Sequence, residues 1–400
     1  MKFSTIHETC MTQKTALNAR DSGLERVLLS ELPVIKTHAL VVSGIRRCGK
    51  STLLHQFIKK MSRDFFYLNF DDLRLADFSH ADYGLLDKII ADSKTSLLFF
   101  DEIQSADRWE LYVRQKLDEG FQVIITGSNA SLLSRELGTR LTGRHISKEL
   151  YPFSYREFCM FKGLAAGHES LGAYLEKGGF PEYLKTDNTE ILTQLQSDIL
   201  YRDIAVRYGI RDSASLRRLY VYLASNPAQK LSPSKLCHIA GVKSPTTVLE
   251  YFSYLEAAYL IHLLPCFAWS AKAQSLAPKK VYIVDPGIIK TSSISFFDNN
   301  GAGLENFVYN NLRCESTDIF YFTGKSGGEC DFIYRPHDKR QCIQVCWELS
   351  HDNQDREING LLEAMDFFDQ KKGLILTYNT EDIIKTAGKT INVIPVWRWN

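Results

Sequence analysis

Eight consecutive residues near the start of the chain have the types and the spacing of a loop that binds phosphate. Gly44 and Gly49 frame the segment, and Lys50 and Ser51 follow, which satisfies the pattern GxxxxGK[ST]. The glycines let successive backbone N–H groups point inward at a β-phosphate. The Lys50 ammonium can then reach the β- and γ-phosphates, and the Ser51 hydroxyl can ligate Mg²⁺. The pattern predicts a site for ATP and Mg²⁺. The predicted nucleotide-binding residues of this stretch are Gly44, Ile45, Arg46, Arg47, Cys48, Gly49, Lys50, Ser51 and Thr52.

Two adjacent carboxylates follow a second apolar run. Four apolar residues, 97–100, lead directly into Asp101 and Glu102. At the C-terminal tip of a strand, Asp101 would hold Mg²⁺ through its water shell, and Glu102 would orient and deprotonate the attacking water. The pair therefore predicts ATP hydrolysis, and it favours water over the substrate hydroxyl that a phosphotransferase would use.

Polar and basic residues follow a third apolar run. Residues 121–126 are followed by a glycine and then by Ser128 and Asn129, either of which could touch the γ-phosphate or the attacking water. Arg140 and Arg144 come next, and an arginine there could offset transition-state charge in the same chain or in a neighbouring subunit. We prefer Arg144 for this role. Ordinary turn residues and surface arginines are the alternatives.

The elements that must position these residues follow from hydrophobic patterning. From residue 38 to about 146, near-continuous apolar runs alternate with helical patterns, which predicts a parallel sheet covered on both faces. The pattern from 151 to about 265 is helical, and strand-like runs return from 280 onward with one helix between 353 and 370. We expect three parts: an ATPase core at 1–150, a helical lid with a winged-helix-like region at 151–275, and an α/β domain at 276–400.

The composition indicates the compartment and the kinds of partner to expect. The 400-residue chain is 44% hydrophobic and 24% charged, which is typical of a soluble folded protein. A net charge of +1 gives no global field, so binding to nucleic acid or to a membrane surface would need a local patch. Nine cysteines without a CxxC pair indicate a reducing compartment, and no apolar run approaches the roughly 18 residues of a membrane span. The expectation is a cytoplasmic protein with neither a secretory signal nor a spanning helix.

Several segments together resemble a known group of ATPases. The stretches "SGIRRCGKSTLL", "YLNFDDLRL", "LLFFDEIQ", "VIITGSNASLLS" and "LYPFSYREF" are similar to the P-loop AAA+ domains of a large prokaryotic group, which is linked to the STAND and archaeal ATPase clades. The resemblance runs from about Glu25 to the end of the chain. It implies Walker A and Walker B motifs, a helical lid, and a C-terminal domain of unknown function similar to restriction-endonuclease folds. It also implies that Pro181, in a "GFP" element, packs near the nucleotide base.

The middle of the chain contains a helix-turn-helix pattern. Pro233 and Pro245 each follow a serine, as at the first position of a helix, and Gly241 marks the turn between the two segments. The resemblance suggests a winged helix. The second helix offers no arginine or asparagine to read bases, so duplex DNA binding and a structural or protein-contact role both stay open.

The last part resembles a nuclease that has lost its catalytic residues. Restriction-like nucleases need a helix glutamate, a strand acid and an E-x-K strand, and Glu305, Glu329 and Asp331 match the first two. Gln344 and Cys346 stand where the glutamate and the lysine belong. We therefore expect a catalytically silent domain that contacts a protein partner.

Taken together, the sequence predicts a Mg²⁺-dependent ATPase that acts as a conformational switch for its C-terminal modules. The alternatives are an ATP-regulated nuclease and a nucleotide-gated binding module with negligible turnover. The output partner and the oligomeric state are left open.

Overall fold

A computed structural model of the protein describes residues 1–129, 141, 143–292, 299–335 and 340–399. The chain forms two compact units. The first contains Met1–Tyr151 together with Ala257–Tyr259, and the second contains Pro152–Glu256 and Leu260–Asn400. Arg140 lies outside the described residues.

The first unit is built on a parallel sheet of five strands. Their order across the sheet is β2-β3-β4-β1-β5, and every neighbouring pair is parallel. The strands are β1 (Ala39–Ser43), β2 (Phe66–Asn69), β3 (Leu97–Asp101), β4 (Gln122–Gly127) and β5 (His145–Glu149). Because β1, β3 and β4 are buried along their whole length, their apolar runs have no polar alternation. The α/β fold with a parallel-sheet core is confirmed.

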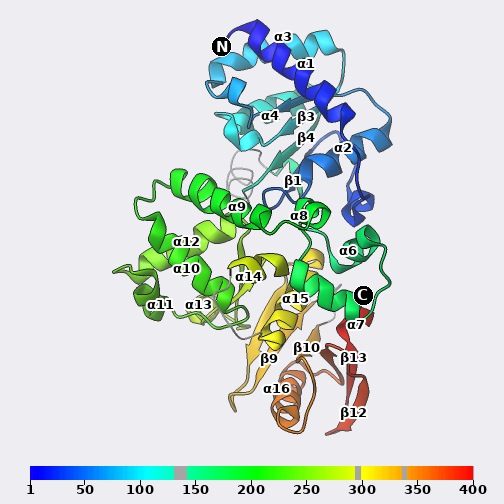
Figure 1. The fold of residues 1–400 in the computed structure, drawn as a ribbon, viewed down its shortest axis with the longest axis vertical. Coiled ribbons are helices and arrows are strands. Elements are labelled where there is room, and N and C mark those ends of the chain that lie inside the picture. The colour runs from blue at the N-terminus through cyan, green and yellow to red at the C-terminus, as the bar shows by residue number, and fades with distance from the viewer. Residues whose placement is uncertain (130–140, 142, 293–298, 336–339, 400) are drawn as a thin grey trace. The chain divides into compact units, whose positions relative to one another are not determined.

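Helices bury the apolar side chains of this sheet. Among the described residues, the α-helices of the first unit are α1 (Phe3–Ala19), α2 (Lys50–Met61), α3 (Tyr83–Ser93) and α4 (Trp109–Asp118). Buried residues of α1, α3 and α4 form one core with strand residues such as Val41, Phe100 and Ile125. The ribbon in Figure 1 shows the course of these helices and strands. Helix α2 starts where the loop after β1 ends. The sheet thus fixes the direction in which that loop leaves β1.

The second unit begins with helices. They are α6 (Tyr155–Lys162), α7 (His168–Lys177), α8 (Pro181–Thr186), α9 (Glu190–Asp198), a π-helical continuation (Ile199–Val206), α10 (Ser213–Ser225), α11 (Pro233–Ala240), α12 (Pro245–Ala257), α13 (Ala271–Leu276) and α14 (Pro286–Ser292). Helices α11 and α12 begin at Pro233 and Pro245, as predicted, and Gly241 caps α11 in the left-handed conformation. Two antiparallel strands lie among these helices: β6 (Ile261–Leu264) between α12 and α13, and β7 (Lys280–Ile283) between α13 and α14. The winged-helix interpretation of this region stays a prediction.

A separate mixed sheet occupies the C-terminal part of the second unit. Its strand order is β12-β13-β11-β10-β9-β8. The strands are β8 (Ile319–Thr323), β9 (Glu329–Tyr334), β10 (Gln341–Val345), β11 (Lys372–Thr377), β12 (Asp382–Thr386) and β13 (Lys389–Pro395), and the helices are α15 (Asn300–Glu315) and α16 (Gln354–Phe367). Side chains of α16 such as Leu361 and Met365 form a core with Cys342 and Ile375 of the sheet. This confirms a separate C-terminal α/β part, while the three-domain boundaries stay a prediction.

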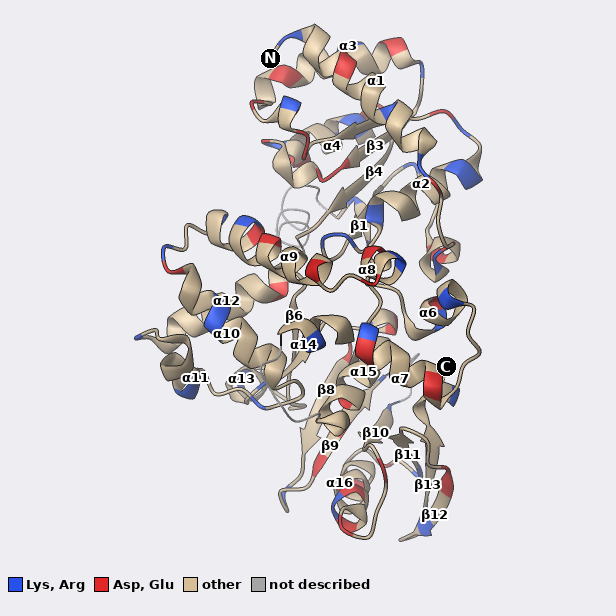
Figure 2. Cartoon of the chain, viewed as in Figure 1, with Lys and Arg blue, Asp and Glu red and all other residues tan. Residues whose placement is uncertain are grey.

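Charged residues of both signs are interspersed along these elements (Figure 2), in keeping with a net charge of +1. Among the described residues, no helix combines the length and the apolar character that crossing a membrane requires.

Candidate functional site

The loop between β1 and α2 has the backbone of a tight phosphate cradle. Gly44 has a φ of 153° and Gly49 a φ of 103°, a region that side chains rarely adopt. A Cβ on Gly44 would lie 2.0 Å from the carbonyl oxygen of Leu150, so no larger residue fits there. Helix α2 begins at Lys50, which leaves the free N–H groups of its first turn at the end of the loop. The geometry suits an anion held by backbone N–H groups.

Lys50 lies inside this cradle. Its ammonium donates to the carbonyl oxygens of Gly44 and Ile45, both at 3.1 Å. It is also 3.5 Å from Oε1 of Glu102, and its side chain is only 4% exposed. Burial alone would lower the pKa of Lys50, but the nearby carboxylate of Glu102 helps to raise that pKa above its ordinary value. Lys50 is therefore a buried cation, and Glu102, the predicted catalytic base, contacts it.

The predicted metal-binding residues Ser51 and Asp101 come together at the end of β3. Asp101 accepts a hydrogen bond from Ser51, one from Thr126 and one from the Tyr67 hydroxyl at 3.0 Å. Burial and the charge of Glu102 raise the pKa of Asp101, and these hydrogen bonds work against the rise. A hydroxyl beside a carboxylate is an oxygen donor set that fits Mg²⁺, which would supply charge neutralisation for a phosphate when bound.

Glu102 is held in one orientation by three contacts. Its Oε2 accepts from Nε2 of Gln104 at 2.6 Å and from the backbone N–H of Ser128 at 3.1 Å. Its own N–H donates to Oγ1 of Thr126 at 2.9 Å, and its φ of 48° turns the chain sharply after β3. Burial opposes ionisation, but Lys50 and these hydrogen bonds hold the pKa of Glu102 below its usual range. The carboxylate is thus ionised at neutral pH and able to accept a proton.

The remaining candidates, Ser128, Asn129 and Arg144, lie at opposite ends of the strands of the parallel sheet. Ser128 and Asn129 are buried directly after β4, and Ser128 contacts Glu102. Arg144 comes just before β5, where its carbonyl oxygen accepts from the N–H of Ala39, the first residue of β1. Because β1 and β5 are parallel, Arg144 lies at the end of the sheet away from the loop. The structure therefore does not bring Arg144 to the cradle of its own chain, and a role in a neighbouring subunit stays a prediction.

The other predicted nucleotide-binding residues are placed as follows. Arg46 forms an ion pair with Asp71, with 3.1 Å between Nη2 and Oδ2. Arg47 adopts a left-handed φ of 63°, and Cys48 is fully buried. Thr52 belongs to the first turn of α2. Pro181 is the first residue of α8 in the second unit, and its contact with a nucleotide base stays a prediction.

Sequence patterns alone missed residues that support the cradle. Arg26 is 5% exposed, and its guanidinium donates to the carbonyl oxygens of Cys48 at 2.9 Å and Tyr151 at 2.7 Å. The hydroxyl of Tyr259 donates to Oγ of Ser43 at 2.7 Å, one residue before the loop. Neither residue belongs to a motif. In the sequence, Arg26 is distinguished only by its position within a mostly apolar stretch, and this is a weak indication of a structural role.

A second polar cluster lies in the C-terminal part and contains a lysine that the sequence interpretation did not anticipate. Lys280 of β7 contacts Glu305, Glu329 and Asp331. These side chains line a cavity of about 650 Å³, together with Gln344. Cys346, the residue directly after β10, stands where the motif of a nuclease would place its lysine.

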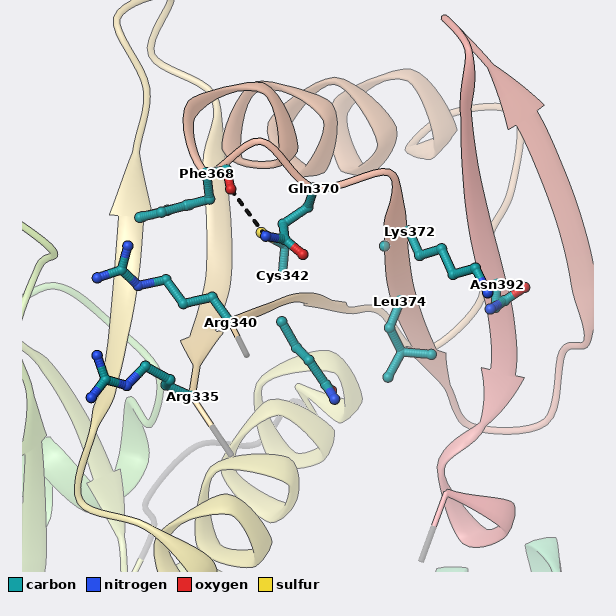
Figure 3. Close-up of a pocket in the computed structure, with 10 residues that line it drawn as sticks. Arg335, Arg340, Cys342, Phe368, Gln370, Lys372, Leu374 and Asn392 are labelled. Atoms are coloured by element: carbon teal, nitrogen blue, oxygen red, sulfur yellow. Dashed lines mark hydrogen bonds between the residues drawn. The ribbon is translucent and has the colours of Figure 1, made fainter. Parts of the chain in front are cut away.

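Another cavity of about 740 Å³ lies at the opposite end of β10 and is lined by three cations, Arg335, Arg340 and Lys372. Figure 3 shows the two arginines pointing toward β8 and β9, while Lys372 points toward Asn392. Arg335 pairs with Asp318, with 3.2 Å between Nε and Oδ2. Because the cations do not converge on one point, this cavity does not form an anion site comparable to the cradle.

Comparison with known proteins identifies three regions of the chain. Residues 36–159 match an AAA domain, residues 168–296 a domain of unknown function (DUF8612), and residues 300–399 a second domain of unknown function (DUF4143). The nuclease-like character of the last region therefore stays a prediction.

Relatives match along nearly the whole length. An uncharacterised protein of Methanocaldococcus jannaschii is 34% identical over 92% of this chain and 90% of its own. An uncharacterised protein of Haemophilus influenzae is 30% identical over 96% of this chain and 98% of its own. A solved structure of AMPPCP-bound DnaA from Aquifex aeolicus is similar over 62% of this chain and 88% of its own, at 16% identity and a TM-score of only 0.27. Its residues 36–159 match an AAA domain, and the chain belongs to the same protein family as the M. jannaschii and H. influenzae proteins.

Proposed function

We propose that the protein binds and hydrolyses ATP with Mg²⁺ at the loop between β1 and α2. The observation that carries this proposal is the meeting of Lys50, Ser51, Asp101 and Glu102 at the C-terminal ends of β1 and β3. A buried cation beside a glycine cradle suits phosphates. An ionised carboxylate next to it suits activation of water. The match to an AAA domain supports nucleotide binding at the same place.

Each side chain has a separate role in the proposed reaction. The N–H groups of the loop and of the first turn of α2 bind the β-phosphate, and Lys50 exchanges contacts with loop carbonyls for contacts with the β- and γ-phosphates. Ser51 and Asp101 hold the metal ion. Glu102 orients the attacking water and accepts its proton, while Gln104 fixes the carboxylate through the 2.6 Å hydrogen bond.

Hydrolysis is favoured over nucleotide binding without turnover for one physical reason. A pure nucleotide sensor needs no base, yet the Glu102 carboxylate is fixed beside the phosphate site by hydrogen bonds from Gln104 at 2.6 Å and from the N–H of Ser128 at 3.1 Å. This arrangement places a proton acceptor where the attacking water is expected. It also directs Oε1 toward the Lys50 ammonium, where the phosphates are expected.

The use of the reaction as a switch is the second part of the proposal. The segment Ala257–Tyr259, which starts at the last residue of α12, groups with the first unit. There the Tyr259 hydroxyl contacts Ser43 at 2.7 Å and Oε1 of Glu149 at 3.4 Å. Because Ser43 precedes Gly44, a change in the loop on phosphate binding bears directly on this hydrogen bond. Tyr259 lies two residues after Ala257, the end of α12. DNA and a protein partner are both open as the recipient of this change.

The experiment compares the wild-type chain with Tyr259→Phe and with an exposed tyrosine control, Tyr201→Phe. ATP turnover should survive in all three proteins, because the Tyr259 hydroxyl donates to Ser43, a residue before the loop that has no role in the proposed reaction. Hydrogen–deuterium exchange of α12 should respond to MgATP in the wild type and in Tyr201→Phe, and the response should shrink in Tyr259→Phe. An equal response in all three proteins would remove Tyr259 as the connection. Absence of turnover in the wild type would remove the ATPase itself.

A further inference from the structure

The cavity of the C-terminal part contains a buried lysine where carboxylates gather. Nζ of Lys280 lies 2.8 Å from Oε1 of Glu305, 2.7 Å from Oε1 of Glu329 and 3.0 Å from Oδ1 of Asp331. The Lys280 side chain is only 3% exposed. The three carboxylates come from α15 and β9, while the lysine comes from β7, so one ammonium joins three elements.

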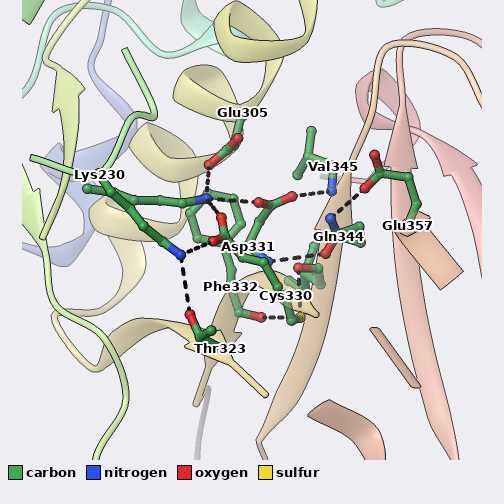
Figure 4. Close-up of polar contacts among 12 residues, drawn as sticks. Lys230, Glu305, Thr323, Cys330, Asp331, Phe332, Gln344, Val345 and Glu357 are labelled. Atoms are coloured by element: carbon green, nitrogen blue, oxygen red, sulfur yellow. Dashed lines mark hydrogen bonds and ion pairs between the residues drawn. The ribbon is translucent and has the colours of Figure 1, made fainter. Parts of the chain in front are cut away.

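The carboxylate oxygens around Lys280 have further donors (Figure 4). The Tyr282 hydroxyl donates to the same oxygen of Glu305 at 2.7 Å. The second oxygen of Asp331 accepts from the N–H of Val345 at 3.0 Å. Lys230 forms an ion pair with the second oxygen of Glu329. Glu329 and Asp331 thus have partners at both of their oxygens, and one oxygen of Glu305 has two.

The strand that would carry the E-x-K pair of a nuclease is also engaged. Oε1 of Gln344 accepts from the N–H of Asp331 at 3.2 Å, and its Nε2 donates to Oε2 of Glu357 at 2.6 Å. Gln344 is thus a bridge between β9 and α16, with both ends of its amide in use. It contributes no charge toward a cation at Asp331.

Electrostatics explains why a cation is needed at this place. Burying carboxylates near one another is costly unless an opposite charge compensates them. Burial and the Asp331 charge raise the pKa of Glu305 to about 7, even with Lys280 present. Burial alone would lower the pKa of Lys280, but Asp331 and the other acidic neighbours raise it well above its ordinary value. Lys280 therefore stays charged at neutral pH and compensates the cluster permanently.

A resident divalent ion does not fit this arrangement. Mg²⁺ and Ca²⁺ need oxygen ligands at about 2.0–2.6 Å, and the Lys280 ammonium occupies the point on which the carboxylates converge. Across the part of the chain that the structure describes, no group of three His, Cys, Asp or Glu residues is arranged to hold a metal ion. A nuclease resemblance implies a metal at Glu305 and Asp331, and the residues present disagree with it.

We infer that Lys280 is the built-in cation of this pocket, and that Glu305, Glu329 and Asp331 serve to anchor β7 rather than to bind a metal. The pocket links the region that matches DUF8612 to the region that matches DUF4143, through Lys280 on one side and the carboxylates on the other. The inference is independent of the proposed ATPase, because it concerns residues of the second unit only.

The first test measures Mn²⁺ binding to the full-length protein without nucleotide, by electron paramagnetic resonance of free Mn²⁺. All proteins carry Asp101→Asn, which removes the metal-binding carboxylate of the first unit. With Lys280 intact, no Mn²⁺ should bind at the C-terminal pocket. Lys280→Met should bind one Mn²⁺, with a Kd at least about tenfold below that of any residual binding by the protein that retains Lys280. Adding Asp331→Asn should abolish that binding. Lys279→Met, at the exposed neighbouring position, is the matched control and should behave as the parent protein does.

Two results overturn the inference. One is Asp331-dependent Mn²⁺ binding by the protein that retains Lys280, and the other is failure of a folded Lys280→Met protein to bind Mn²⁺. If Lys280→Met does not fold, thermal unfolding of the parent protein and of its Asp331→Asn variant decides the question. Both proteins carry Asp101→Asn here as well. Mn²⁺ should leave the Tm of both proteins unchanged, and the protein with Asp331→Asn should have the lower Tm. A rise in Tm with Mn²⁺ in the protein that keeps Asp331, absent after Asp331→Asn, contradicts the inference.

Nuclease assays test the remaining alternative, in which Lys280 is a catalytic lysine. The wild type should not cleave DNA or RNA with Mg²⁺ or Mn²⁺. Metal-dependent cleavage that is lost in both Lys280→Met and Asp331→Asn would overturn the inference and assign the pocket to a nuclease.

Discussion

Replacing Glu102 by glutamine tests the proposed base and the environment that holds it. Oε2 of Glu102 accepts hydrogen bonds from Gln104 and Ser128, so the carbonyl oxygen of the new amide should take that position. The NH₂ group then faces the ammonium of Lys50, which lies 3.5 Å from Oε1 in the native protein. The variant therefore loses a proton acceptor and also loses the anionic partner of Lys50.

The two losses predict opposite effects on turnover and affinity. Loss of a general base typically costs about 10²–10⁴-fold in rate, which corresponds to about 3–5 kcal/mol in the barrier. A hydrogen bond to a charged group is worth about 1.5–3 kcal/mol. Lys50 must give up this contact with Glu102 to reach a phosphate, so ATP affinity should rise, by roughly tenfold if part of that energy is recovered.

The assay combines steady-state phosphate release with equilibrium binding of a fluorescent ATP analogue in the presence of Mg²⁺. Asp92→Asn, at an exposed position on α3, is the matched control and should leave both quantities unchanged. Turnover by Glu102→Gln within a fewfold of wild type would mean that another residue is the base. A weaker affinity would refute the idea that the Lys50–Glu102 contact competes with the phosphates.

Three further predictions concern the supports of the two units. Gly44→Ala should abolish nucleotide binding and lower the Tm, because its Cβ would lie 2.0 Å from the Leu150 oxygen, whereas Gly84→Ala in α3 meets nothing within 4 Å and should leave both unchanged. Arg26→Met should lower the free energy of unfolding by about 2–4 kcal/mol in urea melts, since it leaves two carbonyl oxygens without their donor; a loss below about 0.5 kcal/mol would contradict this. Burial raises the pKa of Asp285 from 3.8 to about 7, against hydrogen bonds from backbone N–H groups. The folded state thus takes up a proton that the unfolded state releases, so the stability from Asp285 is lost as the pH rises through about 7. The destabilisation by Asp285→Asn should accordingly be larger at pH 5 than at pH 8 in urea melts, and a pH-independent difference would contradict the assignment.

Much of the first unit could be predicted because its signals are local. The strands β1, β3 and β4 are buried throughout, so each appears in the sequence as an uninterrupted apolar run. The cradle is encoded within eight residues, and Asp101 and Glu102 directly follow one of these runs. Parallel strands bring their C-terminal ends to one edge, which explains why the carboxylates and Lys50 were expected to meet.

Edge strands gave weaker signals. The side chains of β5 are half-buried or exposed, and those of β12 are mostly exposed, so neither shows a strong apolar pattern. Because β5 was not recognised in the sequence, the location of Arg144 could not be predicted. Arg144 comes after β4 in the chain, but it directly precedes β5 and so lies at the N-terminal end of that strand.

Contacts between distant residues could not be predicted from one sequence. Arg26 is 22 residues from Cys48 and 125 from Tyr151. Lys280 is 51 residues from Asp331. No periodicity links such pairs, because their proximity comes from the packing of whole elements. The sequence itself shows that the E-x-K strand lacks a lysine. It does not show that Lys280 of β7 lies beside Asp331.

The most direct test of the central proposal is phosphate release from ATP by the purified wild-type chain as Mg²⁺ is varied, with Lys50→Ala alongside. The wild type should release phosphate only when Mg²⁺ is present. Lys50→Ala removes the buried cation of the cradle and should reduce both nucleotide binding and turnover to background. Lys60→Ala, at the exposed end of α2, should match the wild type. Turnover and ATP affinity that are the same in Lys50→Ala as in the wild type would contradict the assignment of this loop as the ATP site.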